Sequence, residues 1–196
     1  MDLHKHLSAS AAEAARVARG AAPGRLDGPT PCADMDTRAL LNHWILYTAY
    51  GLEKRALREP LPAEWLERDF TAEPDWAEAY AAQLDRAVAA WSDPAVWEGE
   101  IPLGEGFVMP APEIARMILK ELVVHGWDVA KATGQEIGCA PETAEAVLAV
   151  VEEYAESYRE YKGFADPVEV PADASALDRA LALSGRDPGW RPDAAR

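Results

Sequence analysis

The apolar residues of the chain recur mainly at the three- and four-residue spacing of a helix. Alanine and leucine are common among them and runs of β-branched residues are scarce, which favours helix over strand. This pattern, with the turn residues that interrupt it, predicts five helices over about residues 3–19, 36–58, 75–91, 112–133 and 141–161. Long helices joined by short connections are typical of a helical bundle, so we expect a mostly α fold.

Capping and turn residues indicate where these helices begin and end. Asp36 is the expected N-cap of the second helix, which stops before Pro60, and Gly134 follows the end of the fourth. Residues 96–109 alternate apolar and polar positions around glycines, which predicts a short hairpin, and a short helix is expected near residues 174–183. The chain should form one domain, residues 1–196, with the bundle over about 1–163 and a C-terminal extension over about 164–196.

Composition and charge narrow the range of partners. With 34 acidic and 19 basic residues, the net charge of −15 makes nucleic acids and membrane surfaces poor partners, because both carry phosphates. The first thirty residues contain no apolar run of signal-peptide length, so we expect a cytoplasmic protein. Cys32 and Cys139 are far apart and outside any CxxC motif, which gives no support for a disulfide framework or a cysteine zinc cluster.

The fourth expected helix carries charged residues on its apolar face. Glu121 and His125 fall in the middle of this face, whereas Lys120 is expected to point to solvent. A carboxylate that faces a core is costly unless it is paired or binds a metal. The i, i+4 spacing of Glu121 and His125 can bring both side chains to one ion. The apolar stripe itself consists of Ile114, Ile118, Leu122 and Val129.

A third ligand is available from the second expected helix. His43 lies near the inward face of that helix, so His43, Glu121 and His125 predict a divalent-metal site with at least one position open to water or substrate. Zinc is the preferred ion, and nickel or ferrous iron would suit the same ligands. The alternative is that the histidines are hydrogen-bonded core residues and that Glu121 pairs with an inward Lys or Arg. The apolar neighbours on the face of His43 are Leu40, Trp44, Tyr47 and Gly51.

Two further residues are candidates for a supporting role. Asp128 lies one turn beyond His125 and could accept a hydrogen bond from its imidazole, which would make it a candidate catalytic residue that orients the histidine. A plain surface acid is an equal alternative for Asp128. Cys32, just before the second helix, is either a reactive thiol or a small buried apolar residue, and the latter is favoured.

Two segments of the chain resemble a known family. They are residues 30–43, Thr-Pro-Cys-Ala-Asp-Met-Asp-Thr-Arg-Ala-Leu-Leu-Asn-His, and residues 121–134, Glu-Leu-Val-Val-His-Gly-Trp-Asp-Val-Ala-Lys-Ala-Thr-Gly. Both resemble the actinobacterial DinB-like metal-binding proteins, which are related to the N-terminal domain of mycothiol-dependent maleylpyruvate isomerase. Residues 168–188 are similar to the same group, so the resemblance covers nearly the whole chain.

The resemblance implies a fold, a site and a reaction class. The fold would be a four-helix DinB bundle that holds one divalent metal, and the family's ligands fall on His43, Glu121 and His125. The cofactor would be a low-molecular-weight thiol such as mycothiol, used for S-transfer, conjugation or isomerisation of an electrophilic small molecule. The isomerase has a further C-terminal domain, which this chain is expected to be too short to contain.

Other functions remain open at this stage. One alternative is attack on a substrate by metal-activated water, without any thiol. A second is a non-catalytic bundle that binds a metal or a small molecule, and a third is a metal-free bundle that works through protein contacts. The last requires a partner for the inward-facing Glu121. A homodimer is one of the oligomeric states that the sequence leaves open.

Overall fold

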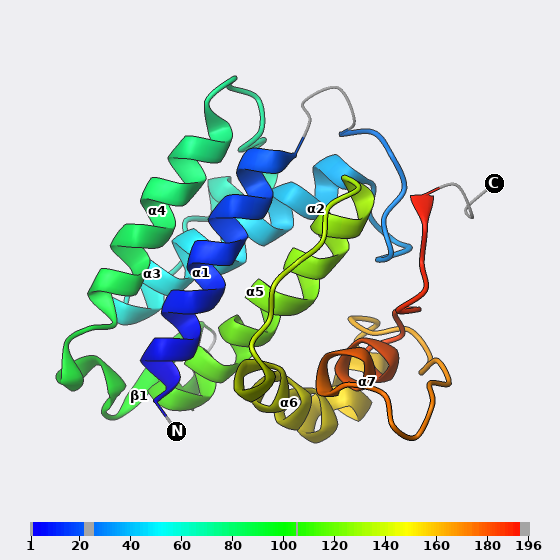
Figure 1. Cartoon of the computed structure of the whole chain (residues 1–196). Helices are drawn as coiled ribbons and strands as arrows, with labels where there is room; N and C mark the ends of the chain where they lie inside the picture. The colour runs from blue at the N-terminus through cyan, green and yellow to red at the C-terminus, as the bar shows by residue number, and fades with distance from the viewer. Residues whose placement is uncertain (1, 22–25, 105, 193–196) are drawn as a thin grey trace.

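The computed structural model describes residues 2–21, 26–104 and 106–192, and it is mostly helical with one small hairpin, which confirms the predicted fold class (Figure 1). A π-helix, η2 (Ile45–Tyr50), joins α2 to α3, and two 3-10 turns, η3 (Ala63–Glu67) and η4 (Pro94–Trp97), lie in the connections on either side of α4. The α-helices are α1 (Leu3–Gly20), α2 (Thr37–Trp44), α3 (Gly51–Ala56), α4 (Trp76–Ala90), α5 (Ala111–Ala132), α6 (Pro141–Glu160) and α7 (Ala176–Leu183).

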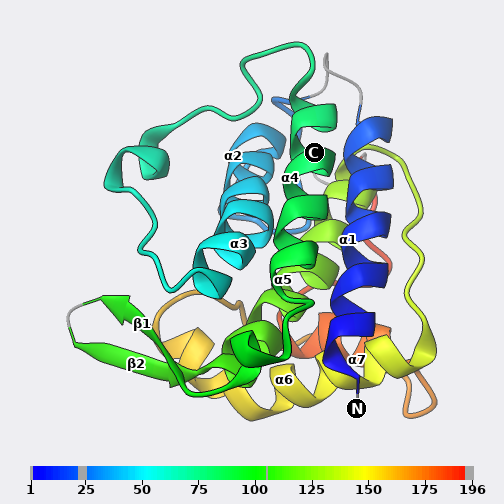
Figure 2. The same cartoon turned by 90° about the vertical axis from the view of Figure 1, so that its left-hand side faces the viewer.

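Four helical segments close a bundle. The four are α1, α4, α5 and the continuous segment formed by α2, η2 and α3. α1 packs against α4 and α5, while α3 packs against α4 and α2 packs against α5, so each segment contacts two others (Figure 1). α6 runs across one end of this bundle and packs against α5 and α7 (Figure 2). The core between the helices includes the fully buried rings of Trp44, Tyr80 and Trp91.

The N-cap of α2, the glycine after α5 and the hairpin form where the sequence predicts them. The Asp36 side chain accepts a hydrogen bond of 2.8 Å from the Ala39 amide, so it caps the N-terminus of α2. Gly134 follows α5 with a φ of +70°, a left-handed conformation that favours glycine at a helix end. The hairpin consists of β1 (Glu100–Gly104) and β2 (Phe107–Pro110), which pair antiparallel and contact α5.

The second predicted helix is continuous but not uniform. The chain is α-helical in α2, widens into the π-helix η2, and returns to α-helix in α3. Inside η2 the Thr48 hydroxyl lies 2.5 Å from the Trp44 carbonyl and 2.7 Å from the Tyr80 hydroxyl of α4. π-Helical turns are rare and occur often at functional sites. Hydrophobic periodicity does not identify such a turn, because the four-residue spacings that suit a π-turn also occur along the apolar stripe of an α-helix.

The segment after α6 folds back over α5. Its conformation depends on Gly185, whose φ is +83° and where an added Cβ would lie 2.6 Å from the Ala165 Cβ. This turn directs the next residue, Arg186, into the protein, where it is 3% exposed. Within the described residues, no helix is both long and apolar enough to cross a bilayer.

Candidate metal centre

His43, Glu121 and His125 meet at one point between α2 and α5. The Glu121 Oε2 atom lies 3.4 Å from the His43 Nε2 atom and 3.2 Å from the His125 Nε2 atom. All three potential ligand atoms lie within 4.8 Å of one another. Their places on the inward faces, together with the packing of α2 against α5, bring the three side chains together.

These separations fit a divalent ion. A tetrahedral zinc ion holds nitrogen and oxygen ligands at about 2.0–2.1 Å, which places neighbouring ligand atoms about 3.3 Å apart. The two distances from the Glu121 oxygen to the histidine nitrogens lie on either side of that value. The imidazole rings of His43 and His125 have centroids 4.9 Å apart and planes inclined by 74°. The residues present can therefore hold an ion through two imidazoles and one carboxylate oxygen.

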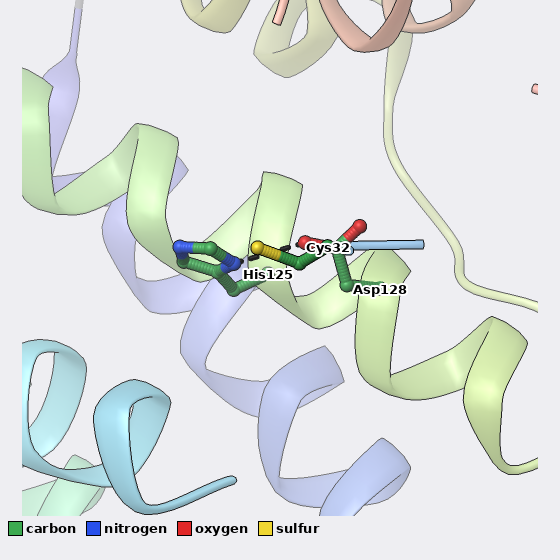
Figure 3. A group of neighbouring side chains, drawn as sticks. All are labelled: Cys32, His125 and Asp128. Atoms are coloured by element: carbon green, nitrogen blue, oxygen red, sulfur yellow. Dashed lines mark hydrogen bonds and ion pairs between the residues drawn. The ribbon is translucent and has the colours of Figure 1, made fainter. Parts of the chain in front are cut away.

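His125 is held between two carboxylates. Its Nε2 atom faces Glu121, and its Nδ1 atom lies 2.9 Å from an Asp128 oxygen (Figure 3). Asp128 is fully buried, so it is not a surface acid. A carboxylate on Nδ1 fixes the orientation of the ring and keeps Nε2 available for a metal, which is the arrangement found around metal-binding histidines.

Arg186 completes this side of the site. Its Nη2 atom donates to Asp128 over 3.0 Å, and its Nη1 atom donates to the Ser184 carbonyl over 2.9 Å. Helical periodicity does not identify Arg186, because this residue lies outside a helix. The only signal in the sequence is an arginine beside a glycine directly after a short apolar helix.

The environment of Lys120 corrects the sequence prediction. Lys120 was expected to point to solvent but is only 2% exposed, and its ammonium group contacts the Glu121 Oε1 atom. The same ammonium lies 4.3 Å from the ring centre of Tyr158 and 5.5 Å from that of Phe164. α6 and the segment after it therefore cover the face of α5 that the hydrophobic pattern left open to solvent. A metal-free bundle requires a partner for the inward-facing Glu121 carboxylate, and Lys120 provides one.

The charges in this cluster set one another's ionisation. Burial by itself would raise the pKa of Glu121, but Lys120 and His125 hold it well below its usual range. Burial would also raise the pKa of Asp128, but Arg186 and His125 lower it. Burial would lower the pKa of His125, yet the Glu121 and Asp128 carboxylates raise it. Both carboxylates are therefore ionised at neutral pH, and either can bind a cation or accept a hydrogen bond.

Cys32 borders the site from the loop before α2. Its Sγ atom lies within 4.8 Å of a His125 ring nitrogen and an Asp128 oxygen (Figure 3). Burial raises the pKa of the Cys32 thiol, and the nearby Arg186 offsets this only in part. Because the thiolate is the reactive form of cysteine, the structure favours a packing role for Cys32 over that of a nucleophile.

Two cavities meet at the histidine of α2. His43 and Tyr47 line both of them. The first, of about 270 Å³, also reaches Glu121 and is otherwise largely apolar. The second, of about 480 Å³, has a more polar lining that includes Arg38, Asn42 and Asp69. Small molecules can therefore approach the His43 side of the site from two directions.

The family is shown by a match over most of the chain. Residues 7–130 match the family model of the mycothiol maleylpyruvate isomerase N-terminal domain. The chain belongs to this family. The suspected relationship is thus confirmed, and the matched region contains His43, Glu121, His125 and Asp128 but not Arg186.

Solved structures support the same fold. The chain is similar to a crystal structure of the mycothiol-dependent maleylpyruvate isomerase and to that of a histidine-to-alanine mutant, each with a TM-score of 0.66 and 15% sequence identity. The match to the mutant covers 95% of this chain and 90% of the isomerase chain, and the other covers 96% and 91%. The expectation that this chain is too short to contain the isomerase's C-terminal part is therefore wrong. No curated protein matches the chain.

Proposed function

We propose that the protein is a divalent-metal-dependent enzyme that uses a low-molecular-weight thiol of the mycothiol type to act on an electrophilic small molecule. The reaction would be an S-transfer, a conjugation or an isomerisation. The observation that carries this proposal is the meeting of His43, Glu121 and His125 beside two cavities. The family match and the names of the similar structures, which are mycothiol-dependent isomerases, support the thiol.

The environment of His125 supports a metal ligand. Both of its ring nitrogens face carboxylate oxygens, and although burial would lower the pKa of the ring, these two charges raise it, so the site favours a cation at this position. With a metal, Nε2 would bind the ion as a neutral imidazole while Nδ1–H donates to Asp128. Lys120 contacts only Oε1 of Glu121, so Oε2 remains directed at the two histidines.

His43, Glu121 and His125 would hold the ion, with zinc as the preferred metal and nickel or ferrous iron as alternatives. When bound, the ion would supply a positive charge that favours the thiolate of a cofactor over its thiol at neutral pH. Asp128 would keep the His125 ring in one orientation. The side chains around the site would exclude water and position the thiol and the electrophile.

The two cavities are suited to different molecules. In the polar cavity, Asp69 accepts hydrogen bonds from Arg38 over 3.0 Å and from Asn42 over 3.1 Å. These groups can exchange hydrogen bonds with the hydroxyl-rich body of a thiol such as mycothiol. The apolar cavity on the other side of His43 would take the electrophile.

The pairing of Lys120 with Glu121 favours a second candidate, a bundle that binds small molecules without metal or catalysis. Lys120 offsets one of the two carboxylate charges around His125, and Arg186 offsets the other. A buried carboxylate is tolerated when it is paired in this way. The two candidates differ in whether the protein holds a stoichiometric metal.

The test is elemental analysis of protein purified without a metal-affinity tag, followed by cobalt substitution and titration with N-acetylcysteine. We expect about one divalent ion per chain and a cobalt spectrum that changes when the thiol is added. The Glu121→Gln variant should lose the metal. The matched control Glu113→Gln, on the same helix and outside the ligand set, should keep it.

The outcomes separate the candidates. A metal that is lost in Glu121→Gln together with a thiol-sensitive cobalt spectrum supports the proposed enzyme. A protein that binds metal but whose cobalt spectrum does not change when the thiol is added contradicts the thiol-dependent reaction. Failure to hold metal even after reconstitution contradicts the metal site and leaves the metal-free candidate.

A further inference from the structure

The apolar cavity has one polar end and one cationic end. Six apolar side chains form its walls, while Glu121 and His43 lie at the candidate metal centre and Arg55 is the one Lys or Arg among the described lining residues. The walls come from α5, from the hairpin and from the connection after α3. The six apolar residues are Leu61, Leu103, Met109, Ile114, Met117 and Ile118.

Arg55 has spare capacity to bind an anion. Its Nη1 atom donates to the Pro102 carbonyl of the hairpin over 3.1 Å, which fixes the guanidinium beside the cavity. Among the described residues, no carboxylate forms an ion pair with it, in contrast to Arg38 and Arg179, which each have an acidic partner. A guanidinium has five N–H donors in a planar fork that matches a carboxylate. Burial lowers the pKa of Arg55, but a guanidinium group is not deprotonated in proteins, so it stays charged.

The helix aligns this cation with the metal centre. His43, Tyr47, Gly51 and Arg55 follow one another at four-residue intervals and all line the same cavity. In an α-helix of 3.6 residues per turn, side chains four residues apart are displaced progressively in one direction around the helix axis. The π-turn of η2 has more residues per turn, which displaces them in the opposite direction and keeps them on one side. Gly51 presents no side chain, which leaves the space between Tyr47 and Arg55 open.

The cavity is too apolar for a molecule charged along its whole length. At about 30 Å³ for each water of the liquid, its volume of about 270 Å³ equals that of roughly nine waters, the size of a small aromatic or short aliphatic acid. A ligand with charges at both ends and no hydrocarbon between them would leave the apolar walls without contacts. A hydrocarbon with one anionic group would satisfy the walls and Arg55 together.

We propose that this cavity binds an organic monocarboxylate with an apolar body. Its carboxylate would pair with Arg55, its hydrocarbon part would lie between the hairpin and α5, and its other end would reach Glu121 and His43. This inference rests on the proposed function in that it names the class of the electrophilic substrate. The recognition of the carboxylate by Arg55 does not itself require the metal.

The test uses 3-phenylpropionate and its neutral counterpart 3-phenylpropanol, titrated into protein treated with a chelator and then into zinc-loaded protein. Binding is followed by NMR of methionine methyl groups labelled with carbon-13. Met109 and Met117 line the cavity and should shift, while Met35 lies outside it and serves as the internal reference. Chelator-treated protein comes first, because a carboxylate could otherwise bind directly to the metal.

The variants isolate the charge of Arg55. Arg55→Met should weaken binding of the acid by about tenfold or more while changing that of the alcohol by less than about twofold. Arg55→Lys should retain part of the affinity for the acid, and Arg179→Met, an exposed arginine on α7, should have no effect. Fumarate, which has two carboxylates and no apolar body, should bind more weakly than 3-phenylpropionate.

Several results would overturn the inference. They are no binding of the acid to the wild-type protein, equal binding to Arg55→Met, fumarate binding as tightly as the phenyl acid, or shifts at Met35 instead of Met109 and Met117. The result is independent of the metal. Arg55-dependent binding in a protein that takes up no metal even after reconstitution would support this inference and contradict the proposed enzyme. A protein that takes up metal but does not bind the acid would contradict this inference and leave the proposed enzyme standing.

Discussion

The two histidines of the proposed metal centre lie in opposite environments. The His125 side chain is 10% exposed, and both of its ring nitrogens face carboxylate oxygens. The His43 side chain is 30% exposed, and its ring packs on Tyr47 and borders two cavities. The protein therefore encloses one histidine among charged partners and leaves the other at the edge of two cavities.

The difference follows from the elements that carry each residue. α5 is covered by α6 and by the segment after it, so Lys120, Asp128 and Arg186 enclose the His125 side. α2 faces the long connection to α4, which leaves space beside His43. We infer that the closed side holds the geometry of the site and that the open side selects what binds.

The largest effect is expected from opening the closed side. Arg186→Met leaves the buried Asp128 without its cation and should lower the free energy of unfolding by about 3–5 kcal/mol, measured by urea denaturation in the presence of a chelator. Adding Asp128→Asn removes the unpaired charge and should restore most of the loss. If the single variant is as stable as the wild type, the closed side does not depend on this pair.

An intermediate effect should separate the two histidines themselves. In chelated protein, His125→Ala should cost about 2 kcal/mol, because it removes one partner from each of two buried carboxylates and leaves a cavity, while His43→Ala should cost less than about 1 kcal/mol. In zinc-loaded protein both variants should lose the additional stability that the metal confers, measured as the shift in melting temperature. Equal losses in the chelated protein would contradict the contrast between the closed and open sides.

Helical periodicity predicted the main helices and the inward faces that carry the proposed ligands. The apolar stripe of α5 placed Glu121 and His125 on an inward face, and the same reasoning placed His43 on α2. Their proximity follows because α2 and α5 are neighbours in the bundle. The N-cap at Asp36 was also predicted correctly, because the Asp36 side chain bonds to the Ala39 amide in the first turn of the same helix.

Periodicity failed where a distant segment covers a helix. Lys120 lies on a face of α5 that is polar in the pattern, but Tyr158 and Phe164 from later in the chain bury it. Arg186 was missed because its position depends on the turn at Gly185, a long-range contact with Ala165. Both errors concern the closed side of the site, which is assembled from tertiary contacts that no local pattern records.

The smallest effect concerns pH and tests whether the two sides of the site differ in protonation. In chelated protein the Glu121 and Asp128 carboxylates raise the pKa of His125, so the native state binds this proton more tightly than the unfolded chain. That stabilisation is complete below the unfolded value of about 6.5 and is lost as pH rises through the higher folded value.

Zinc requires the neutral imidazole, so its affinity should instead increase with pH over the same range. Urea denaturation across this window should therefore show stability that falls with pH in chelated protein and stays nearly constant in zinc-loaded protein, because the gain in zinc affinity offsets the loss. His125→Ala should flatten the chelated slope, while His43→Ala should retain it. A slope that persists in His125→Ala would assign the proton to another group and remove the electrostatic part of the contrast.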